Sequence, residues 1–272
     1  MRYIFIKKTI MKELENISKE IENTQVIIIA GGMGKRMGTI DKPKALLEIN
    51  GTTLIDYTIE LLKNCGFKDL RLLIGYKHEE IEKHLGDGSR HGVKITYSVE
   101  PETIKGRAKA MKYALINKKI DKTKRALICF PDDIFTDRKL PIKLLLQHLH
   151  GVEEKKALVT VLFVSGTSYP FGVAEMDADM FVTSFIEKPF IPKYTSTGQY
   201  MIEPEVFERI EKEIDLDSKE SPKLEHKILP ELAAERKVQG MVVSSSVWLS
   251  VNTAKEHETA EKVLSKRKCL VT

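Results

Sequence analysis

The sequence predicts an α/β fold in which a doubly wound, mainly parallel sheet is followed by a mixed or antiparallel β extension. Two observations lead to this prediction. Short apolar runs alternate with amphipathic helical patterns from residue 26 to residue 150, and after residue 157 strand-like runs follow one another without helices between them. Such alternation is typical of parallel sheets with helices on both faces. The 272 residues, 42% of them hydrophobic, are enough to bury a full core.

The first half of the chain alternates strand and helix patterns. Buried strands are read from short apolar runs, and helices from apolar residues that recur every three or four positions. Strands are expected over 26–30, 70–75, 93–99 and 125–130. Helices are expected between and after them over 54–63, 78–85, 106–116 and 141–150.

The second half begins with four strand-like runs joined by turns: ALVTVLFV, FGVAEM, MFVTSFIE and STGQYMIE. Because no helix pattern separates them, we expect them to extend the sheet with antiparallel strands. The chain then returns to helices over 205–213 and 224–235, a strand over 238–244 and a closing helix over 254–266.

We expect residues 1–24 to form an amphipathic helical extension ahead of the first strand, and residues 25–272 to form a single domain. Ile10, Leu14, Ile17 and Ile21 recur at helical spacing with charged residues between them. The apolar stripe is narrow, so we expect it to dock on the domain or on a second subunit, and we expect a homo-oligomer.

Composition excludes several classes of protein. The 44 basic and 39 acidic residues leave a net charge of only +5, spread along the chain, which does not indicate a nucleic-acid partner. No apolar run approaches the roughly 20 residues of a membrane span. The three cysteines, Cys65, Cys129 and Cys269, lie far apart without CxxC spacing. A cytoplasmic protein without a membrane partner is therefore expected.

The stretch VIIIAGGMGKRMG, residues 26–38, runs a buried strand into a glycine-rich basic turn. Glycines at a strand end let backbone N–H groups approach an anion without interference from Cβ. A P-loop would need GKS or GKT after a longer spacing, which is absent. A dinucleotide-binding turn would need glycine where Met37 stands and an acidic residue closing the second strand, and basic DKPKALLEING follows instead.

AGGMGKRMG followed by KPKAL resembles the signature of the sugar-1-phosphate nucleotidyltransferase family, usually AGGxGTRL, a spacer and PKPL. Three later segments also resemble that family. FGVAEMDADMFVTSFIEKP is similar to its YGVV and EKP segment, STGQYMIEPEVFERI to its NAGIYVF stretch, and the segment ending in WLSVNT to its WxDIGTP closing segment. The matches occur in the family's order from residue 26 to about 264. The resemblance implies a Rossmann-like fold of the nucleotide-diphospho-sugar transferase type.

The resemblance also implies a reaction and its residues. A sugar-1-phosphate oxygen would attack the α-phosphorus of a nucleoside triphosphate and expel pyrophosphate. Positioning and charge neutralisation are the main tasks of the protein in such chemistry. The implied catalytic residues are Arg36, on the leaving pyrophosphate, Lys44, near the α-phosphate, and Asp132. The implied nucleotide-binding residues are Ala30, Gly31, Gly32, Gly34, Lys35, Glu100, Gly106 and Arg107.

FPDDI, residues 130–134, follows a buried strand at a position where open α/β sheets bind ligands. It resembles the family's GDD or GDN motif, which implies Asp132 as a magnesium ligand. Adjacent carboxylates at a strand end can also cap the next helix. Mg²⁺ prefers oxygen ligands, and no His or Cys lies nearby in the sequence. For the sugar phosphate, the resemblance implies Gly172, Glu187, Lys188 and Gly198.

Two departures from the family pattern stand out. Arg107, in KGRAKAM, replaces a small residue of the usual GTAGAL, and it either contacts the nucleotide or faces solvent. Ser250, in WLSVNT, stands where a metal-binding aspartate is expected. Asn252 shares a strand face with Ser250 and offers a carbonyl oxygen, so we predict Asn252 as the second magnesium ligand.

Several functions remain open from the sequence. The first is an active nucleotidyltransferase whose substrates are a nucleoside triphosphate and a sugar-1-phosphate. A catalytically impaired regulatory relative that binds nucleotide is favoured by Ser250 and disfavoured by Lys44, Asp132 and Lys188. A cytidylyltransferase acting on a non-sugar alcohol phosphate is a variant of the first, and a nicotinamide-dependent oxidoreductase is the weakest alternative.

Overall fold

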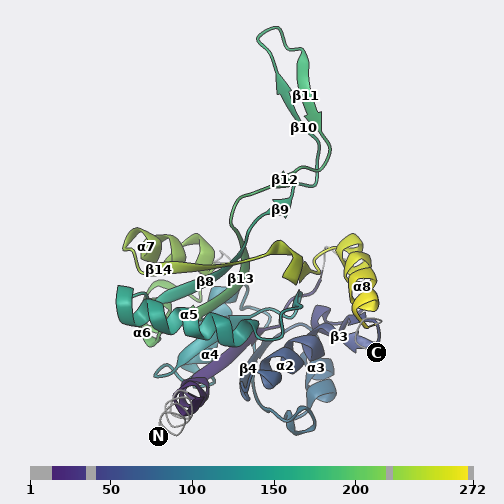
Figure 1. Ribbon diagram of the computed structural model, residues 1–272. Helices are drawn as coiled ribbons and strands as arrows, with labels where there is room; N and C mark the ends of the chain where they lie inside the picture. Colours follow the sequence, from purple (N-terminus) through teal and green to yellow (C-terminus); the bar gives the residue numbers. More distant parts are fainter. Residues whose placement is uncertain (1–13, 35–40, 219–222, 269–272) are drawn as a thin grey trace, which may run out of the picture.

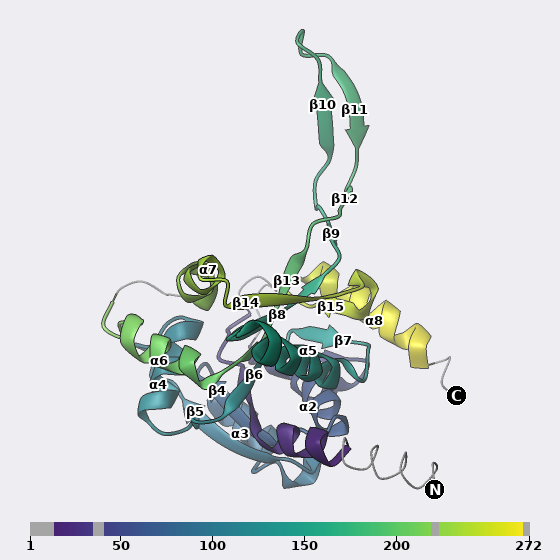
Figure 2. The same cartoon turned by 60° about the vertical axis from the view of Figure 1, so that its left-hand side comes forward.

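The computed structural model describes residues 14–34, 41–218 and 223–268, and its centre is a seven-stranded sheet (Figures 1 and 2). The strands lie in the order β14, β8, β13, β6, β1, β4, β5. All neighbouring strands are parallel except β13, which is antiparallel to both β6 and β8. Their bounds, in that spatial order, are Val238–Val243, Val159–Val164, Thr195–Ile202, Arg125–Cys129, Thr24–Ile29, Asp69–Ile74 and Lys94–Val99. The α/β fold with a mainly parallel, mixed sheet is confirmed.

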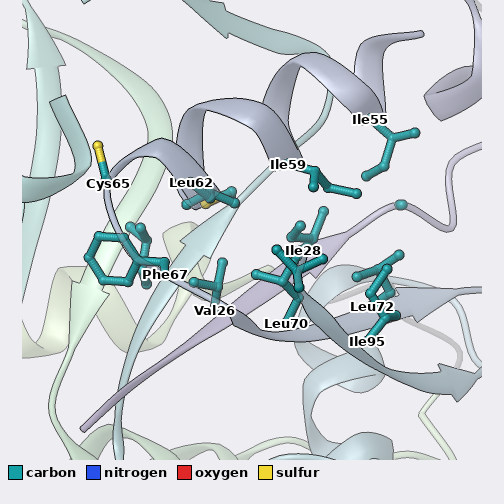
Figure 3. Close-up of a cluster of buried hydrophobic side chains, with 14 of the residues drawn as sticks. Val26, Ile28, Ile55, Ile59, Leu62, Cys65, Phe67, Leu70, Leu72 and Ile95 are labelled. Carbon is teal, nitrogen blue, oxygen red and sulfur yellow. The ribbon is translucent and has the colours of Figure 1, made fainter. Parts of the chain in front are cut away.

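Helices cover both faces of the sheet because alternate residues of a strand point to opposite sides. Val26 and Ile28 of β1 pack in one buried cluster with α2, α3 and α5, whereas Ile27 packs in a second with α4, α6 and α7. Figure 3 shows Ile55 and Ile59 of α2 lying over the β1 residues. The helices are α2 (Leu54–Asn64), α3 (His78–Leu85), α4 (Arg107–Ile116), α5 (Leu140–Lys155), α6 (Pro204–Glu213), α7 (Ile228–Ala234) and α8 (Ala254–Lys268).

Short elements complete the rim of the sheet. β2 (Glu48–Ile49) pairs with β3 (Thr52–Thr53), and β7 (Asp133–Phe135) pairs with β15 (Trp248–Ser250). The described part of the chain also contains the 3₁₀ turns η2 (Lys44–Leu46), η3 (Ser89–His91), η4 (Leu224–His226) and η5 (Ser245–Val247). The helix expected over 224–235 is thus divided into η4 and α7.

The antiparallel extension expected after residue 157 joins the sheet only in part. β8 and β13 are strands of the sheet, but β10 (Val173–Met176) and β11 (Val182–Ile186) pair with each other in a hairpin that projects from the body (Figures 1 and 2). A local turn closes the hairpin, because Asp177 Oδ1 accepts hydrogen bonds from the backbone N–H groups of Asp179 and Phe181 at 3.0 and 2.9 Å. Below it, β9 (Thr167–Ser168) pairs with β12 (Phe190–Ile191). The strand pattern was right, but pattern alone does not specify the pairing partner.

The N-terminal helix is described over residues 14–22. Ile21 packs against the core cluster that contains β1, and the Glu20 carboxylate pairs with Arg125 at 2.6 Å. Leu14 is exposed. This part of the extension therefore contacts the chain's own body at its C-terminal end, whereas Ile10 lies outside the described residues, and docking on a second subunit stays a prediction.

Candidate active site

The site lies where the order of the sheet reverses. From β1, the chain adds β4 and β5 on one side, and then β6 on the other. Open α/β sheets bind ligands at such a point, beyond the carboxyl ends of the strands. A cleft of about 1150 Å³ opens there, with Gly31 after β1, Glu100 after β5 and Asp132 after β6 among its lining residues. Its position agrees with the reversal of strand order.

The glycine-rich turn after β1 forms one wall of the cleft. Ala30, Gly31 and Gly32 line it directly. A Cβ on Gly31 would lie 3.4 Å from the backbone nitrogen of Gly75, so the turn packs closely against the loop after β4. Gly34 has a φ of +67°, a conformation that favours glycine. Backbone N–H groups are thereby free of side-chain bulk where a phosphate would approach.

Lys44 connects three separate parts of the chain at the cleft. It begins the turn η2, and its ammonium donates to Asp132 Oδ2 at 2.5 Å and to Asn252 Oδ1 at 2.8 Å. The side chains of Lys44 and Asp132 are largely buried, at 13% and 19% exposed. Two oxygens thus converge on one positive charge at the edge of the cleft.

Pairing of β7 with β15 brings Asn252 to Asp132. Ser250 lies opposite Asp133 in this pair, and the Val251 N–H donates to the Asp132 carbonyl at 2.8 Å. The Ser250 hydroxyl accepts a hydrogen bond from the Asn252 amide nitrogen at 2.6 Å, which turns the amide oxygen toward Lys44. Ser250 is therefore in place to orient Asn252.

Asp133 has a different role from its neighbour. Its carboxylate is buried and accepts a hydrogen bond from the Trp248 indole N–H at 2.7 Å. Burial, and then the nearby Asp132 charge, raise the pKa of Asp133. Asp133 thus holds β15 against β7, whereas Asp132 lines the cleft.

Arg107 lies at the start of α4 and faces the cleft. Its guanidinium stacks 4.0 Å from the centre of the Phe130 ring and lies 3.4 Å from the Glu225 carboxylate. Gly198, with φ +85°, lies behind the same ring, where a Cβ would come within 3.1 Å of Phe130. Gly198 therefore packs against Phe130, and it is the Phe130 ring that lines the cleft. Of the two alternatives for Arg107, contact with the cleft fits this geometry, since the guanidinium is held in a fixed plane.

Among the titratable groups that line the cleft, Glu100 has the pKa that burial raises most clearly. Its Oε1 atom is buried without a hydrogen-bond partner, and both carboxylate oxygens lie 3.5 Å from the position of a Cβ on Gly31. Burial raises the pKa of Glu100 from 4.5 to about 7. A carboxylate repels phosphate, so this group is suited to accept hydrogen bonds from the base or ribose of a nucleotide.

The raised pKa makes folding stability depend on Glu100. The folded state holds this proton more tightly than the unfolded chain, so stability falls as pH rises from about 4.5 to about 7. Glutamine at position 100 is neutral at every pH. We therefore expect the free energy of unfolding of Glu100→Gln to exceed that of the parent protein by about 2 to 3 kcal/mol at pH 8 and to equal it at about pH 4.5. Urea denaturation at the two pH values measures this, with exposed Glu102→Gln as the control. Equal gains at both pH values would contradict the account.

Comparisons with known proteins identify the family of this chain. Residues 25–266 match the model of the family described as "Nucleotidyl transferase". The chain belongs to the nucleotidyl transferase family. It is 27% identical over 241 residues to a Drosophila pseudoobscura pseudoobscura mannose-1-phosphate guanylyltransferase catalytic subunit beta, covering 87% of this chain and 61% of that protein. It is 31% identical over 224 residues to a Synechocystis UTP–glucose-1-phosphate uridylyltransferase, covering 76% of this chain and 56% of that one.

A solved structure has the same fold. It is a Bacillus anthracis protein in complex with sucrose, named as a glucose-1-phosphate thymidylyltransferase, with TM-score 0.66 and 25% identity, covering 88% of this chain and 94% of the other. The chain spans about three fifths of the length of the curated relatives it matches. No helix in the described ranges is long and apolar enough to cross a bilayer.

Half of the residues that the sequence singled out line the cleft, eight of sixteen: Ala30, Gly31, Gly32, Lys44, Glu100, Gly106, Arg107 and Asp132. Lys35 and Arg36 lie outside the described residues. Tyr76 and Lys77 also line the cleft and were missed, because nothing in their sequence context distinguishes them from a surface loop.

Three predicted sugar-phosphate residues lie on the projecting hairpin instead. Gly172, Glu187 and Lys188 are exposed and are absent from the lining of the cleft. They do lie near one another: a Cβ on Gly172 would be 3.1 Å from the Glu187 carboxylate, and the Lys188 ammonium is 3.1 Å from Glu187. Within one chain, the structure does not bring this group to Lys44 and Asp132.

Proposed function

We propose that this protein joins a nucleoside triphosphate to a sugar-1-phosphate, forming a nucleotide-activated sugar and pyrophosphate. The observation that carries the proposal is the contact of Lys44 with Asp132 and Asn252 beside a glycine-rich turn at the switch point of the sheet. Family membership and relatives named for such activities support it.

The residues of the cleft have distinct tasks in this reaction. The turn at residues 30–34 binds the triphosphate through backbone N–H groups, and Lys44 stabilises the charge on the α-phosphate. A sugar-phosphate oxygen forms the new bond to the α-phosphorus, the bond from that phosphorus to the bridging oxygen breaks, and the electron pair leaves with pyrophosphate. No covalent intermediate with a side chain is required, so positioning is the main contribution of the protein.

The donor set at Lys44 also suits magnesium. A carboxylate oxygen of Asp132 and an amide oxygen of Asn252 converge on a single point, and both are hard ligands of the kind Mg²⁺ prefers. The described residues contain no cluster of three or more His, Cys, Asp or Glu side chains that could hold a metal. When bound, Mg²⁺ neutralises charge on the phosphates. Asp132 and Asn252 would hold it after Lys44 turns toward the nucleotide.

We expect Asn252→Ala to raise the magnesium concentration for half-maximal activity by about tenfold, which corresponds to roughly 1.4 kcal/mol. The reason is the loss of one of two protein oxygens that face the same point. Ser250→Ala, which removes only the acceptor that orients Asn252, should have a smaller effect in the same direction, and Ser250→Asp should tighten binding. Magnesium titrations of the variants distinguish the two ligands. If Asn252→Ala has no effect and Ser250→Ala is inactive, the second magnesium ligand is Ser250 and not Asn252.

Glu100 bears on the choice of base. Above pH 7, where Glu100 is mostly ionised, its carboxylate offers two acceptors and no donor, and guanine presents two adjacent N–H donors on its Watson–Crick edge. This favours GTP among the common nucleotides, in line with relatives named as guanylyltransferases. The test is pyrophosphate release measured across the common nucleoside triphosphates and a panel of hexose-1-phosphates. Release with one sugar phosphate, fastest with GTP, is expected; nucleotide binding without release from any pair would favour the regulatory alternative.

A further inference from the structure

The basic side chains of α4 all bind one part of the chain. α4 carries three of them, Arg107, Lys109 and Lys112, and α6 lies beside it (Figure 2). All three donate hydrogen bonds to residues 211–218 or 223–225, at the end of α6 and in η4. We call these two stretches the strap. Because α4 begins at the cleft, it connects the strap to the cleft.

The two lysines hold the backbone of the strap. Lys109 is only 2% exposed, and its ammonium donates to the Leu216 carbonyl at 3.0 Å and to the Ser218 carbonyl. Lys112 donates to two further carbonyls of the strap, at 2.7 and 2.6 Å. A buried ammonium is costly unless its N–H groups are hydrogen-bonded, so these contacts hold the strap in one position against α4.

The contact of Arg107 with the strap is an ion pair at the edge of the cleft. Its Nη1 donates to Glu225 Oε1 at 3.4 Å, and the same oxygen accepts a hydrogen bond from the Tyr200 hydroxyl at 2.8 Å. Leu224, next to Glu225, is buried in the same cluster as Ala108, next to Arg107. The Glu225 carboxylate is therefore fixed in place by its neighbour and by the buried Tyr200.

These contacts orient the Arg107 guanidinium but leave donors available. The 3.4 Å contact with Glu225 is longer than the usual range of about 2.7 to 3.2 Å, and it is the one hydrogen bond of this group to the described residues. One face of the guanidinium lies on the Phe130 ring, 4.0 Å from its centre. Since a guanidinium has more N–H donors than this contact uses, its remaining edge is available to a ligand in the cleft.

The charges along the cleft favour an anionic ligand for Arg107. The lining holds as many basic as acidic side chains: Lys44, Lys77, Lys105 and Arg107 against Glu79, Glu100, Glu102 and Asp132. Lys44 and Lys77 each contact a carboxylate at 2.5 Å, whereas the Arg107 pair is longer and its arginine side chain is 42% exposed. Exposed pairs contribute little to stability. Arg107 is thus free to bind an anion without first breaking a short ion pair.

Arg107 also faces the part of the cleft that contains Lys44. Phe130, on which its guanidinium stacks, is two residues before Asp132. The positive charges of Lys44 and Arg107 both act on the buried Asp133 carboxyl, lowering its pKa against the larger effects of burial and of the Asp132 charge. A guanidinium can bind phosphate through two parallel N–H···O contacts, which a lysine ammonium does not offer.

We propose that Glu225 is a positioning residue, which holds the Arg107 guanidinium over Phe130 so that its free N–H edge binds phosphate oxygens of the nucleoside triphosphate. The identity of this ligand rests on the proposed function. Arg107 touches the ligand, whereas Glu225 acts through Arg107. The strap thereby supplies a partner for the arginine that replaces a small residue of the family pattern.

Binding of inorganic triphosphate tests the contact of Arg107 with phosphate without a base and without turnover. Isothermal titration calorimetry on Arg107→Ala should show an affinity about tenfold or more below that of the parent protein. Lys119→Ala, which removes one exposed positive charge just after α4, is the control and should stay within about twofold of the parent. Equal affinities of the two variants, or a parent that binds no triphosphate at millimolar concentration, would overturn the proposal.

The sign of the Glu225 effect separates positioning from charge. Removing a negative charge beside a phosphate site strengthens anion binding if charge alone acts. Positioning predicts the opposite, so Glu225→Ala should weaken triphosphate binding by about three- to tenfold, and it should cause no further loss in the Arg107→Ala background. Tighter binding in Glu225→Ala, or additive losses in the double variant, would overturn the role of Glu225.

A second variant guards against a loss of folding. Glu225→Ala leaves the buried Tyr200 hydroxyl without its acceptor, which is destabilising. Glu225→Gln keeps an acceptor for that hydroxyl and removes the charge, so thermal unfolding should match the parent while triphosphate binding weakens about threefold. Tighter binding in Glu225→Gln would equally overturn the role of Glu225.

These measurements distinguish the inference from the proposed function. If no substrate pair releases pyrophosphate but triphosphate binding depends on Arg107 and Glu225 as described, the proposed function fails and the phosphate contact stands. If pyrophosphate is released but triphosphate binding is indifferent to both residues, the inference fails alone.

Discussion

Lys44→Met is expected to lower kcat/KM by about 100- to 1000-fold while leaving the fold intact. Methionine keeps much of the length of the side chain but removes the charge that meets Asp132 and Asn252. A buried, charge-assisted contact to a transition state contributes about 3 to 4 kcal/mol, which corresponds to that loss in rate. Steady-state kinetics and thermal unfolding on the same sample measure the two effects. Lys122→Met, at an exposed ion pair with Glu211, is the matched control.

The same variant separates two roles of Lys44. In the protein without substrate its ammonium lies where the two oxygens converge, so its removal should tighten magnesium binding even though turnover falls. Weaker magnesium binding, or turnover equal to that of Lys122→Met, would contradict the assignment.

Asp132→Asn is the second large effect. The change keeps the shape of the side chain but removes the negative charge that faces Lys44, so we expect kcat to fall by about 100-fold or more and the need for magnesium to rise. The fold should persist, since the Val251 N–H bonds to the backbone carbonyl of residue 132 and not to its side chain. Asp217→Asn, in an exposed turn, is the control. Activity within threefold of the parent would remove Asp132 from the site.

Much of the fold could be predicted because local patterns determine it. The helix expected over 78–85 coincides with α3, and the strand expected over 93–99 matches β5 to within one residue, since apolar periodicity and flanking turns mark both. The place of the cleft also followed from glycines and carboxylates at strand ends. These features need no knowledge of distant contacts.

What the sequence did not reveal depends on contacts between distant segments. That β10 and β11 pair with each other and not with the seven-stranded sheet depends on which strand is available to which, and a strand pattern at 173–176 and 182–186 does not specify the partner. The buried, unpaired carboxylate of Glu100 results from packing of the loops after β1, β4 and β5. Phe130 was not predicted as a site residue, because its place in the site depends on contacts of its ring with the distant residues Arg107 and Gly198.

The central claim is direct transfer of a nucleotidyl group to a sugar phosphate, and the fate of labelled oxygen tests it most directly. The preferred nucleotide is incubated with magnesium and a sugar-1-phosphate whose three non-bridging phosphoryl oxygens are ¹⁸O, and the products are weighed by mass spectrometry. Because the attacking oxygen becomes the new bridge, the account predicts a nucleotide sugar that retains all three labelled oxygens, together with unlabelled pyrophosphate. Nucleoside monophosphate with unchanged sugar phosphate, or ¹⁸O in pyrophosphate, would contradict it.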